Sequence, residues 1–259
     1  MKPDAAYGVC NAAPLVSGGM QDSNSNDSGQ VQFFLTPKHP CSYLNRNSAQ
    51  TLFFDPRQVV TPDIYQALTD QGFRRSGSHL YRPHCGSCQA CIPTRLPVAQ
   101  FKPRRSQRKV MRRNQDLHVR IEEAAFSRRH FHLYERYISL RHADGDMYPA
   151  SEDQYRSFLL SPWSNSLFVS LYDRDRLLSV AVTDKQPRGL SAIYTFFEPL
   201  EERRSLGVFS ILKQIELCQD WDIPHLYLGY WIKDCEKMSY KTQYRPAELY
   251  INNGWIPLT

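Results

Sequence analysis

Residues 191–221 read SAIYTFFEPLEERRSLGVFSILKQIELCQDW. The segment opens with seven residues typical of a β-strand, passes through a loop that contains arginine and glycine, and ends in a helical pattern from Val208 to Trp221. We expect Ser205 to cap this helix. Because free backbone N–H groups and the helix dipole favour anions at a helix N-terminus, the sequence predicts a phosphate site at Ser205–Gly207.

Strand-like segments flank this unit on both sides. Upstream, the runs Leu167–Tyr172, Leu177–Thr183 and Ser191–Phe197 are joined by short polar turns, which predicts an antiparallel meander. Downstream, Leu226–Ile232 is one more predicted strand. The order of meander, loop, helix and strand is similar to the acyl-transfer half of the N-acetyltransferase (GNAT) superfamily. This resemblance implies an α+β fold in which helices cover a mixed or antiparallel GNAT-like sheet.

The same resemblance bears on the acyl donor. The superfamily's usual pyrophosphate loop reads Arg/Gln-x-x-Gly-x-Gly/Ala, whereas residues 204–209 of this chain read RSLGVF and lack the last small residue. We therefore expect that the protein does not use coenzyme A. An acetyl-CoA-dependent N-acetyltransferase is the alternative that this loop argues against.

A strongly basic segment precedes the meander. Residues 71–115 contain no acid and carry 11 of the 32 Lys and Arg residues, so their formal charge is +11 while the rest of the chain has −5. Such a concentration of charge is typical of a surface that binds a polyanion. Six of these side chains would form one broad stripe on a helix, for which a solvated helical face is the alternative: Arg104, Arg105, Arg108, Lys109, Arg112 and Arg113. The candidate phosphate contacts are Lys102, Arg104, Arg105, Arg108, Lys109, Arg112 and Arg113.

The cysteines suit a metal centre better than a disulfide framework. Their number, seven, is odd, and Cys85, Cys88 and Cys91 follow one another at Cys-x-x-Cys spacing. This spacing lets the thiolates reach one metal ion, and either Cys41 or His84 can be the fourth ligand. Zinc and an iron–sulfur cluster both fit the pattern. Thiols that bind no metal are the alternative.

Composition divides the chain into three parts. Residues 1–30 end in a polar run rich in Gly, Ser, Asn and Asp, so we expect a disordered tail, and Met20 is a candidate for the natural start. Residues 31–115 form the expected Cys-rich basic domain, and residues 116–259 form the expected GNAT-like domain. No apolar run approaches the roughly 20 residues of a membrane span. We expect a cytoplasmic protein that does not contact the membrane.

Several motifs in fixed order closely resemble the arginyl-tRNA–protein transferase family. They are Gly72–Gly77, the cysteine run, Phe101–Pro103, Ser106–Val110, Ser205–Gly207, Tyr227–Tyr230 and Met238–Lys241. The segments Cys41–Leu44, His84–Cys91 and His142–Met147 are similar to the bacterial branch of that family, the aspartate/glutamate leucyltransferases. The resemblance covers the chain from about Val31 to its end. Eukaryotic members carry Cys-Gly-Tyr-Cys where this chain has Cys41-Ser42-Tyr43-Leu44, which implies a differently built metal site.

The family resemblance implies an aminoacyltransferase. Its donor is a charged tRNA, and its acceptor is a protein with N-terminal Asp or Glu that is thereby marked for degradation. Leucine is the expected transferred residue, and arginine is the alternative. The planar fork of an arginine matches the acceptor's carboxylate, and Arg74, Arg75 and Arg95 are the candidates, each with a structural ion pair as its alternative role. Residues 31–115 would bind metal, tRNA and acceptor, and residues 116–259 would perform the transfer.

The transfer needs groups that remove a proton and stabilise an oxyanion, because the acceptor's α-amine attacks an already activated ester. The candidates are Tyr194, Tyr230, Tyr240 and Lys241, while the backbone amides at Ser205 and Gly207 would place the tRNA's 3′ end. Core packing is the alternative role for Tyr194 and Tyr230. The acids of the Asp144-Gly145-Asp146 turn are further candidate bases. A non-catalytic, metal-stapled RNA-binding module is the competing hypothesis for the whole chain.

Overall fold

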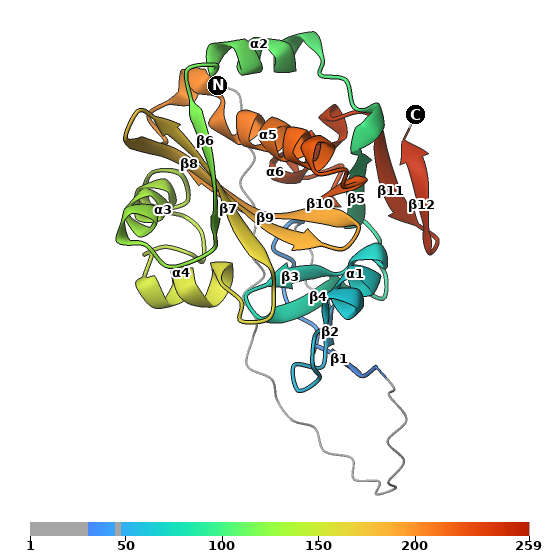
Figure 1. Ribbon diagram of the computed structural model, residues 1–259. Helices are drawn as coiled ribbons and strands as arrows, with labels where there is room; N and C mark the ends of the chain where they lie inside the picture. Colours follow the sequence, from blue (N-terminus) through green and yellow to red (C-terminus); the bar gives the residue numbers. More distant parts are fainter. Residues whose placement is uncertain (1–30, 45–47, 259) are drawn as a thin grey trace, which may run out of the picture.

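The computed structural model describes residues 31–44 and 48–258, and it combines two β-sheets with flanking helices (Figure 1). The expected disordered tail at residues 1–30, with Met20, lies outside the described residues. The α+β class expected from the sequence is confirmed. The helices are α1 Pro62–Asp70, α2 Arg105–Arg113, α3 Arg128–Arg141, α4 Glu152–Leu159, α5 Leu206–Asp220 and α6 Glu236–Ser239, with short 3-10 turns η1 Val98–Gln100, η2 Glu202–Arg204 and η3 Tyr240–Gln243.

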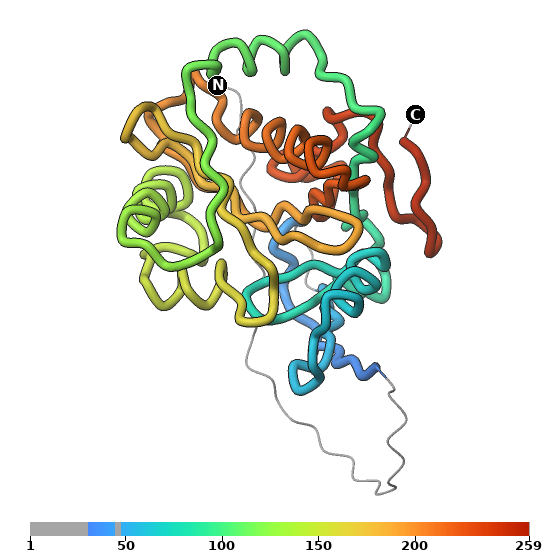
Figure 2. The backbone as a smooth tube through the Cα atoms, in the orientation of Figure 1, coloured from blue at the N-terminus to red at the C-terminus, as the bar shows by residue number. Residues whose placement is uncertain are grey.

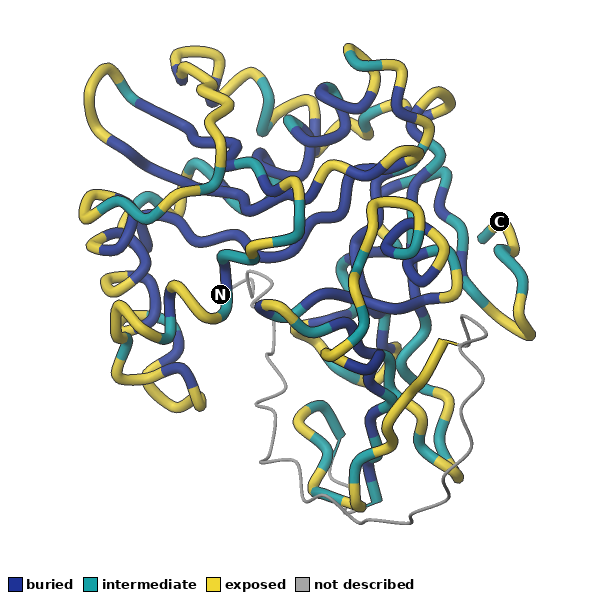
Figure 3. The backbone as a smooth tube through the Cα atoms, turned by 60° about the horizontal axis from the view of Figure 1, so that its bottom comes forward, coloured by how far each residue is buried: buried dark blue, intermediate teal, exposed yellow. Residues whose placement is uncertain are grey.

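The larger sheet is mixed, and only β9 and β10 run parallel within it. Its strands, in spatial order, are β12 Gly254–Leu258, β11 Ala247–Ile251, β5 Ile92–Pro97, β10 His225–Trp231, β9 Gly189–Phe197, β8 Arg176–Gln186, β7 Ser166–Asp173 and β6 His118–Glu123. The meander and the strand after α5 expected from the sequence are therefore confirmed as β7, β8, β9 and β10. All nine residues of β9 are buried, as expected for a central strand covered on both faces (Figure 3).

Helices cover both faces of the larger sheet. On one face, α5 packs its apolar side chains Ile211, Leu212 and Ile215 against the strands. On the other face, α3 supplies Tyr134 and Tyr137 to an aromatic core that also receives α4. Figure 2 shows α2 running beside α5, against which it packs. This layered core fixes the strands whose ends form the site described below.

The smaller sheet has the order β1-β2-β4-β3 and is antiparallel throughout. Its strands are β1 Phe33–Leu35, β2 Thr51–Phe54, β4 His79–Pro83 and β3 Arg74–Ser76. Helix α1 follows β2 and begins at Pro62, because Thr61 caps it by accepting a hydrogen bond from the Ile64 amide at 3.2 Å. The β3–β4 hairpin lies against the larger sheet, and β3 contacts β9 directly.

The boundary expected at residue 115 does not follow the sheets. Strand β5 belongs in sequence to the Cys-rich region, yet it lies between β10 and β11 in the larger sheet and pairs with both. The two expected domains therefore share one sheet. Among the described residues, no helix has both the length and the apolar character that a membrane crossing requires.

Candidate active site where β9 and β10 separate

The parallel strands β9 and β10 pair only over their first residues. His225, Leu226 and Tyr227 pair with 189–191, after which the strands have no paired residues. A β-bulge between Tyr227 and Gly229 accompanies this separation on the β5 side. The strands thus separate toward their C-terminal ends, which is also the end from which α5 begins. In open sheets with parallel strands, this edge is where ligands bind.

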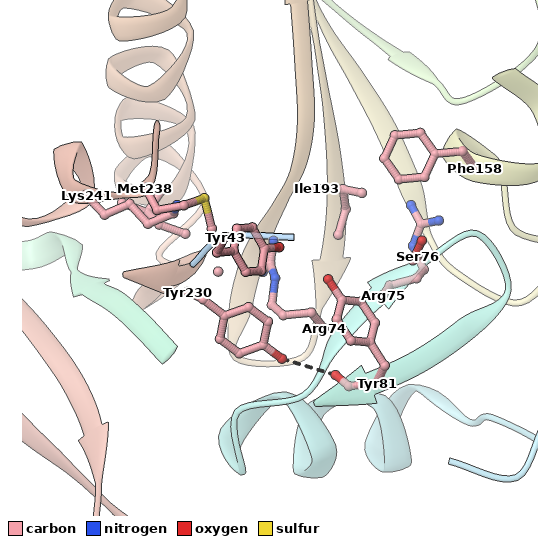
Figure 4. Close-up of a pocket in the computed structure, with 12 residues that line it drawn as sticks. Tyr43, Arg74, Arg75, Ser76, Tyr81, Phe158, Ile193, Tyr230, Met238 and Lys241 are labelled. Atoms are coloured by element: carbon pink, nitrogen blue, oxygen red, sulfur yellow. Dashed lines mark hydrogen bonds between the residues drawn. The ribbon is translucent and has the colours of Figure 1, made fainter. Parts of the chain in front are cut away.

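The side chain of Arg74 fills the separation between the two strands (Figure 4). Its Nη1 donates to Ser191 Oγ at 2.7 Å and to the Tyr227 carbonyl at 3.5 Å, and its Nη2 donates to the Ala192 carbonyl. The guanidinium therefore replaces part of the hydrogen bonding that a closed pair of strands would make. Arg74 is only 7% exposed and has no acidic partner among the described residues.

Gly229 makes the insertion of Arg74 possible. Its φ is +82°, a conformation that L side chains rarely adopt. A Cβ at this position would lie 3.3 Å from Arg74 Nε and 3.5 Å from its Cζ. Glycine is thus required at residue 229 both for its backbone conformation and for the space that the guanidinium occupies.

A cavity of about 40 Å³ adjoins Arg74, which is room for two or three water molecules. Figure 4 shows its lining side chains converging from β3, β4, β9, β10, α4, α6 and η3 and from the loop that holds Tyr43. Three of them are basic, Arg74, Arg75 and Lys241, and the guanidinium of Arg75 is paired with Asp184. The other side chains are that of Ser76 and a set of aromatic or apolar ones: Tyr43, Tyr81, Tyr230, Phe158, Ile193, Leu228 and Met238. This combination suits a ligand that has one anionic group and one apolar group.

Lys241 is fully buried at the edge of this cavity. Its Nζ lies 3.4 Å from the Met238 sulfur and 4.8 Å from the centre of the Tyr240 ring. Burial in this apolar setting, and then the positive charge of Arg74, lower the pKa of Lys241 to about 7. A lysine with such a pKa is largely neutral just above pH 7, so it can accept a proton.

The structure brings some of the candidate catalytic residues together and separates others. Tyr230 and Lys241 line the cavity, and Tyr240 contacts Lys241. The Tyr230 hydroxyl donates to the backbone carbonyls of Gly72 and Tyr81, at 3.0 and 3.2 Å, so it holds the small sheet in place. Tyr194 lies in the aromatic core at 1% exposure and does not line the cavity.

The acids of the 144–146 turn lie away from the cavity. Asp144 and Asp146 are exposed in the turn that follows α3, where the Gly145 amide donates to the His142 carbonyl. Neither residue lines the cavity. Their placement fits a turn role.

The three candidate arginines for the acceptor carboxylate have different surroundings. Arg75 forms a fully buried ion pair with Asp184, with 2.6 Å between Nε and Oδ2. Arg95 Nε pairs with Glu248 at 2.6 Å, and its Nη1 lies 3.5 Å from Asp70. Both guanidinium groups are thus already matched to carboxylates within the protein. Arg74 is the one of the three that has no such partner among the described residues.

The basic stripe covers α2 and the residues just before it, since Lys102 and Arg104 precede the helix, and it adjoins the start of α5. All seven of its candidate side chains are exposed, and none is in an ion pair within the described part of the chain. The C-terminal end of α2 is tied to η2, since the Asn114 side chain donates to the Arg204 carbonyl at 2.8 Å and Arg113 donates to the Arg203 carbonyl. Ser205 is the N-cap residue of α5, as expected, but its side chain makes no capping hydrogen bond. The two groups of expected tRNA contacts are therefore neighbours.

The four candidate metal ligands are half-buried cysteines in the loops around the small sheet. The Leu44 amide donates to Cys41 Sγ at 3.4 Å and the Gln50 amide donates to Cys85 Sγ at 3.5 Å. Across residues 31–44 and 48–258, no three His, Cys, Asp or Glu side chains are grouped closely enough to hold a metal ion. These four thiols do not form a ligand set in the structure. The zinc or iron–sulfur site therefore stays a prediction, and no chemical step is assigned to it.

Sequence reasoning did not select several residues of this site. Phe158 and Ile193 line the cavity but resemble ordinary core residues in the sequence, and Met238 belongs to the Met238–Lys241 motif but was not chosen as a site residue. Asp184 was also missed, because the end of β8 around it reads TDKQ, and this polar sequence gives no sign that the carboxylate is buried.

Comparisons with known proteins agree with this geometry. Residues 39–109 match the sequence family described as "Arginine-tRNA-protein transferase, N terminus", and residues 129–251 match its C-terminal counterpart. The aspartate/glutamate leucyltransferase of Pseudomonas fluorescens (strain Pf0-1) is 55% identical over 229 residues, which is 88% of this chain and 97% of that protein. The aspartate/glutamate leucyltransferase of Hahella chejuensis is 51% identical, over 87% of this chain and 97% of its own.

Solved structures add little to this comparison. L-PGS from Bacillus licheniformis covers 79% of this chain and 69% of its own, at 11% identity and a TM-score of 0.44, which is too low to carry an argument. The two family matches and the high identity over most of the chain decide the assignment. The chain belongs to the arginine-tRNA-protein transferase family and is an aminoacyltransferase.

Proposed function

We propose that this enzyme transfers leucine from leucyl-tRNA to the α-amine of proteins that begin with Asp or Glu. The names of its relatives support leucine as the transferred residue and Asp or Glu as the acceptor. The observation that carries the proposal is the placement of Arg74 beside Lys241 in one small cavity, because it puts a carboxylate-binding group next to a candidate base.

The donors of Arg74 fit an incoming carboxylate. An arginine has five N–H donors. Three of the Arg74 donors bind Ser191, Ala192 and Tyr227, which leaves Nε–H and one N–H of Nη2 without a partner among the described residues. A carboxylate accepts two such bonds at once, and the bonds are strong because both groups are charged. We assign these two donors to the side chain of the acceptor's first residue.

Lys241 then acts on the acceptor's α-ammonium group. The neutral amine of Lys241 takes one proton from it, and the resulting amine nitrogen attacks the carbonyl carbon of the leucyl ester. A C–N bond forms, and the tetrahedral oxyanion collapses by breaking the bond to the ribose oxygen. That oxygen leaves with the second proton of the attacking amine, and Lys241 releases the first proton to water. The donor ester is already activated, so no covalent enzyme intermediate is needed.

The tRNA lies along the exposed stripe of α2 in this proposal. Neutralising its phosphates there releases counterions and supplies salt-dependent affinity. The Gly207 amide binds the phosphate near the 3′ end, because it lies in the first turn of α5 at the edge where β9 and β10 separate, whereas the Ser205 amide already donates to the Glu202 carbonyl at 3.2 Å. The larger sheet then serves as a GNAT-like frame in which aminoacyl-tRNA takes the place of coenzyme A.

The remaining parts of the proposal concern context. The leucylated product marks its protein for degradation, and the reaction takes place in the cytoplasm. Cys41, Cys85, Cys88 and Cys91 bind zinc or an iron–sulfur cluster that ties the loops around the small sheet.

The test compares Arg74→Ala with Arg82→Ala. Arg82 lies on the neighbouring strand β4, and within the described part of the chain its guanidinium binds the Gln71 carbonyl and packs on the face of Phe73. Labelled leucine or arginine is supplied as charged tRNA to peptides that begin with Asp, Glu, Asn or Lys. Leucine should appear on the Asp and Glu peptides only, and RNase should abolish the transfer. Arg74→Ala should raise the KM for the Asp peptide at least 30-fold, whereas Arg82→Ala should leave it within twofold. Equal KM values for the two variants would refute the carboxylate site.

A further inference from the structure

The two consecutive arginines of β3 point to opposite sides of the strand and are bound by neighbouring strands of the larger sheet. Arg74 reaches Ser191 on β9, and Arg75 reaches Asp184 on β8. Ser191 and Asp184 are themselves direct cross-strand partners. Two adjacent residues of β3 are therefore hydrogen-bonded to a single cross-strand residue pair of the larger sheet, Asp184 and Ser191.

Asp184 is the centre of a fully buried network. Its two carboxylate oxygens accept from Arg75 Nε at 2.6 Å and from Arg75 Nη2 at 2.9 Å. The hydroxyls of Tyr65 and Ser166 donate to the same carboxylate at 2.6 and 2.7 Å. Both side chains of the ion pair are 0% exposed. The carboxylate thus has a complete set of donors and a single defined geometry.

The same network also holds the other side of the cavity. Arg75 donates to the carbonyl of Leu159, the last residue of α4, at 3.2 Å. The tip of the β3–β4 hairpin docks on the same helix, since the Gly77 amide donates to the Phe158 carbonyl at 3.0 Å. A Cβ on Gly77 would lie 2.1 Å from the Ser157 carbonyl oxygen, so only glycine fits there. Phe158 lines the cavity, and its helix is therefore placed by the contacts that place Arg74 (Figure 4).

We propose that Asp184 is a positioning residue for acceptor recognition, because its buried pair with Arg75 sets β3 so that Arg74 enters the separation between β9 and β10. A buried ion pair is weak evidence for stability, since well-packed apolar residues often replace such a pair at no cost. Its value here is geometric, because it fixes one arginine and thereby orients the next. The inference rests on the proposed role of Arg74 as the carboxylate-binding residue.

The experiment compares Asp184→Asn with Asp55→Asn. Asp55 is 2% exposed and forms a two-point pair with Arg57, whose own side chain is 73% exposed, and it lies outside the cavity. Asp184→Asn should raise the KM for a peptide with N-terminal Asp about tenfold or more, with kcat and the Kd for leucyl-tRNA within twofold of wild type. Asp55→Asn should change neither kinetic constant. If the role of Asp184 is purely structural, both variants should show a lower unfolding midpoint and unchanged KM and kcat, and that result would overturn the proposal.

Arg75→Lys provides a second measurement if Asp184→Asn does not fold. It keeps the buried charge but loses the two-point geometry, so it should give the same rise in KM at unchanged kcat. An unchanged KM in this variant would also overturn the proposal. Arg74→Ala distinguishes the carboxylate-binding role of Arg74 from the positioning role of Asp184. If it leaves KM unchanged, the carboxylate role of Arg74 fails; if it raises KM while Asp184→Asn and Arg75→Lys do not, only the positioning role of Asp184 fails.

Discussion

Replacing Lys241 with methionine should stabilise the protein while it abolishes transfer. The amine is fully buried, and burial together with the charge of Arg74 lowers its pKa from 10.5 to about 7. Between these two values, the unfolded chain binds a proton at Lys241 that the folded chain does not. The wild type is therefore destabilised by this lysine most strongly below pH 7, and the penalty fades as the pH rises toward 10.5.

The size of the effect follows from the shift. A difference of about 3.5 pKa units at about 1.4 kcal/mol per unit gives an upper bound of roughly 5 kcal/mol at or below pH 7. At pH 9 only about 1.5 units remain, so the bound falls to roughly 2 kcal/mol. Lys241→Met removes the penalty and keeps the apolar contacts, so its advantage in the free energy of unfolding should shrink by about 3 kcal/mol between pH 6.5 and pH 9.

Urea unfolding at these two pH values measures the difference, and labelled-leucine transfer to an Asp peptide measures activity. Lys213→Met is the matched control, because Lys213 is a partly buried lysine of α5 that pairs with Glu216 and lies outside the cavity. Its stability should lie within about 1 kcal/mol of wild type at both pH values. If Lys241→Met is less stable than wild type, or if its advantage does not change with pH, then Lys241 is charged in the folded protein and cannot be the proton acceptor.

Three other predictions address the backbone, the tRNA surface and the metal. Gly229→Ala should cost about 1–2 kcal/mol of stability because of its positive φ, and it should raise the acceptor KM by displacing Arg74; urea unfolding and peptide kinetics check both effects. Changing Arg105, Arg108 and Arg112 together to Gln should weaken leucyl-tRNA binding and lower the slope of log K against log salt by about 2 to 3, as measured by filter binding; an unchanged slope would place the tRNA elsewhere. Cys85→Ser should lower the zinc or iron content found by elemental analysis, and equal metal in the variant and the wild type would contradict the ligand assignment.

The central elements were predictable because their sequence pattern matches their burial. The apolar runs that became β7 to β10 and the helical period that became α5 each describe an element whose core-facing side is set by local sequence. Strand β5 was not predictable in this way. Its sequence IPTRLP contains two prolines and a charge, and it forms a strand because β10 and β11 pair with it from both sides.

The site was predictable in its residue types more than in its geometry. Arg74 and Lys241 were selected from motifs, but nothing local shows that Arg74 enters a separation between strands 117 residues further along the chain. Likewise, two adjacent arginines look equivalent in the sequence. Both line the cavity, but their opposite directions along β3 give Arg75 a buried carboxylate partner and leave Arg74 without an acidic partner among the described residues. Long-range packing decides between them.

The hydrogen bonds that hold Arg74 have a further consequence for how broadly the enzyme can act. An unrestrained arginine loses roughly 2 kcal/mol of rotamer entropy when it is immobilised. Here the strand carbonyls and Ser191 have already immobilised it during folding, so little of that cost falls on binding. An acceptor can then be held mainly through its first residue, without extensive contacts farther along its chain. Proteins of unrelated sequence would share one requirement, an accessible acidic N-terminus.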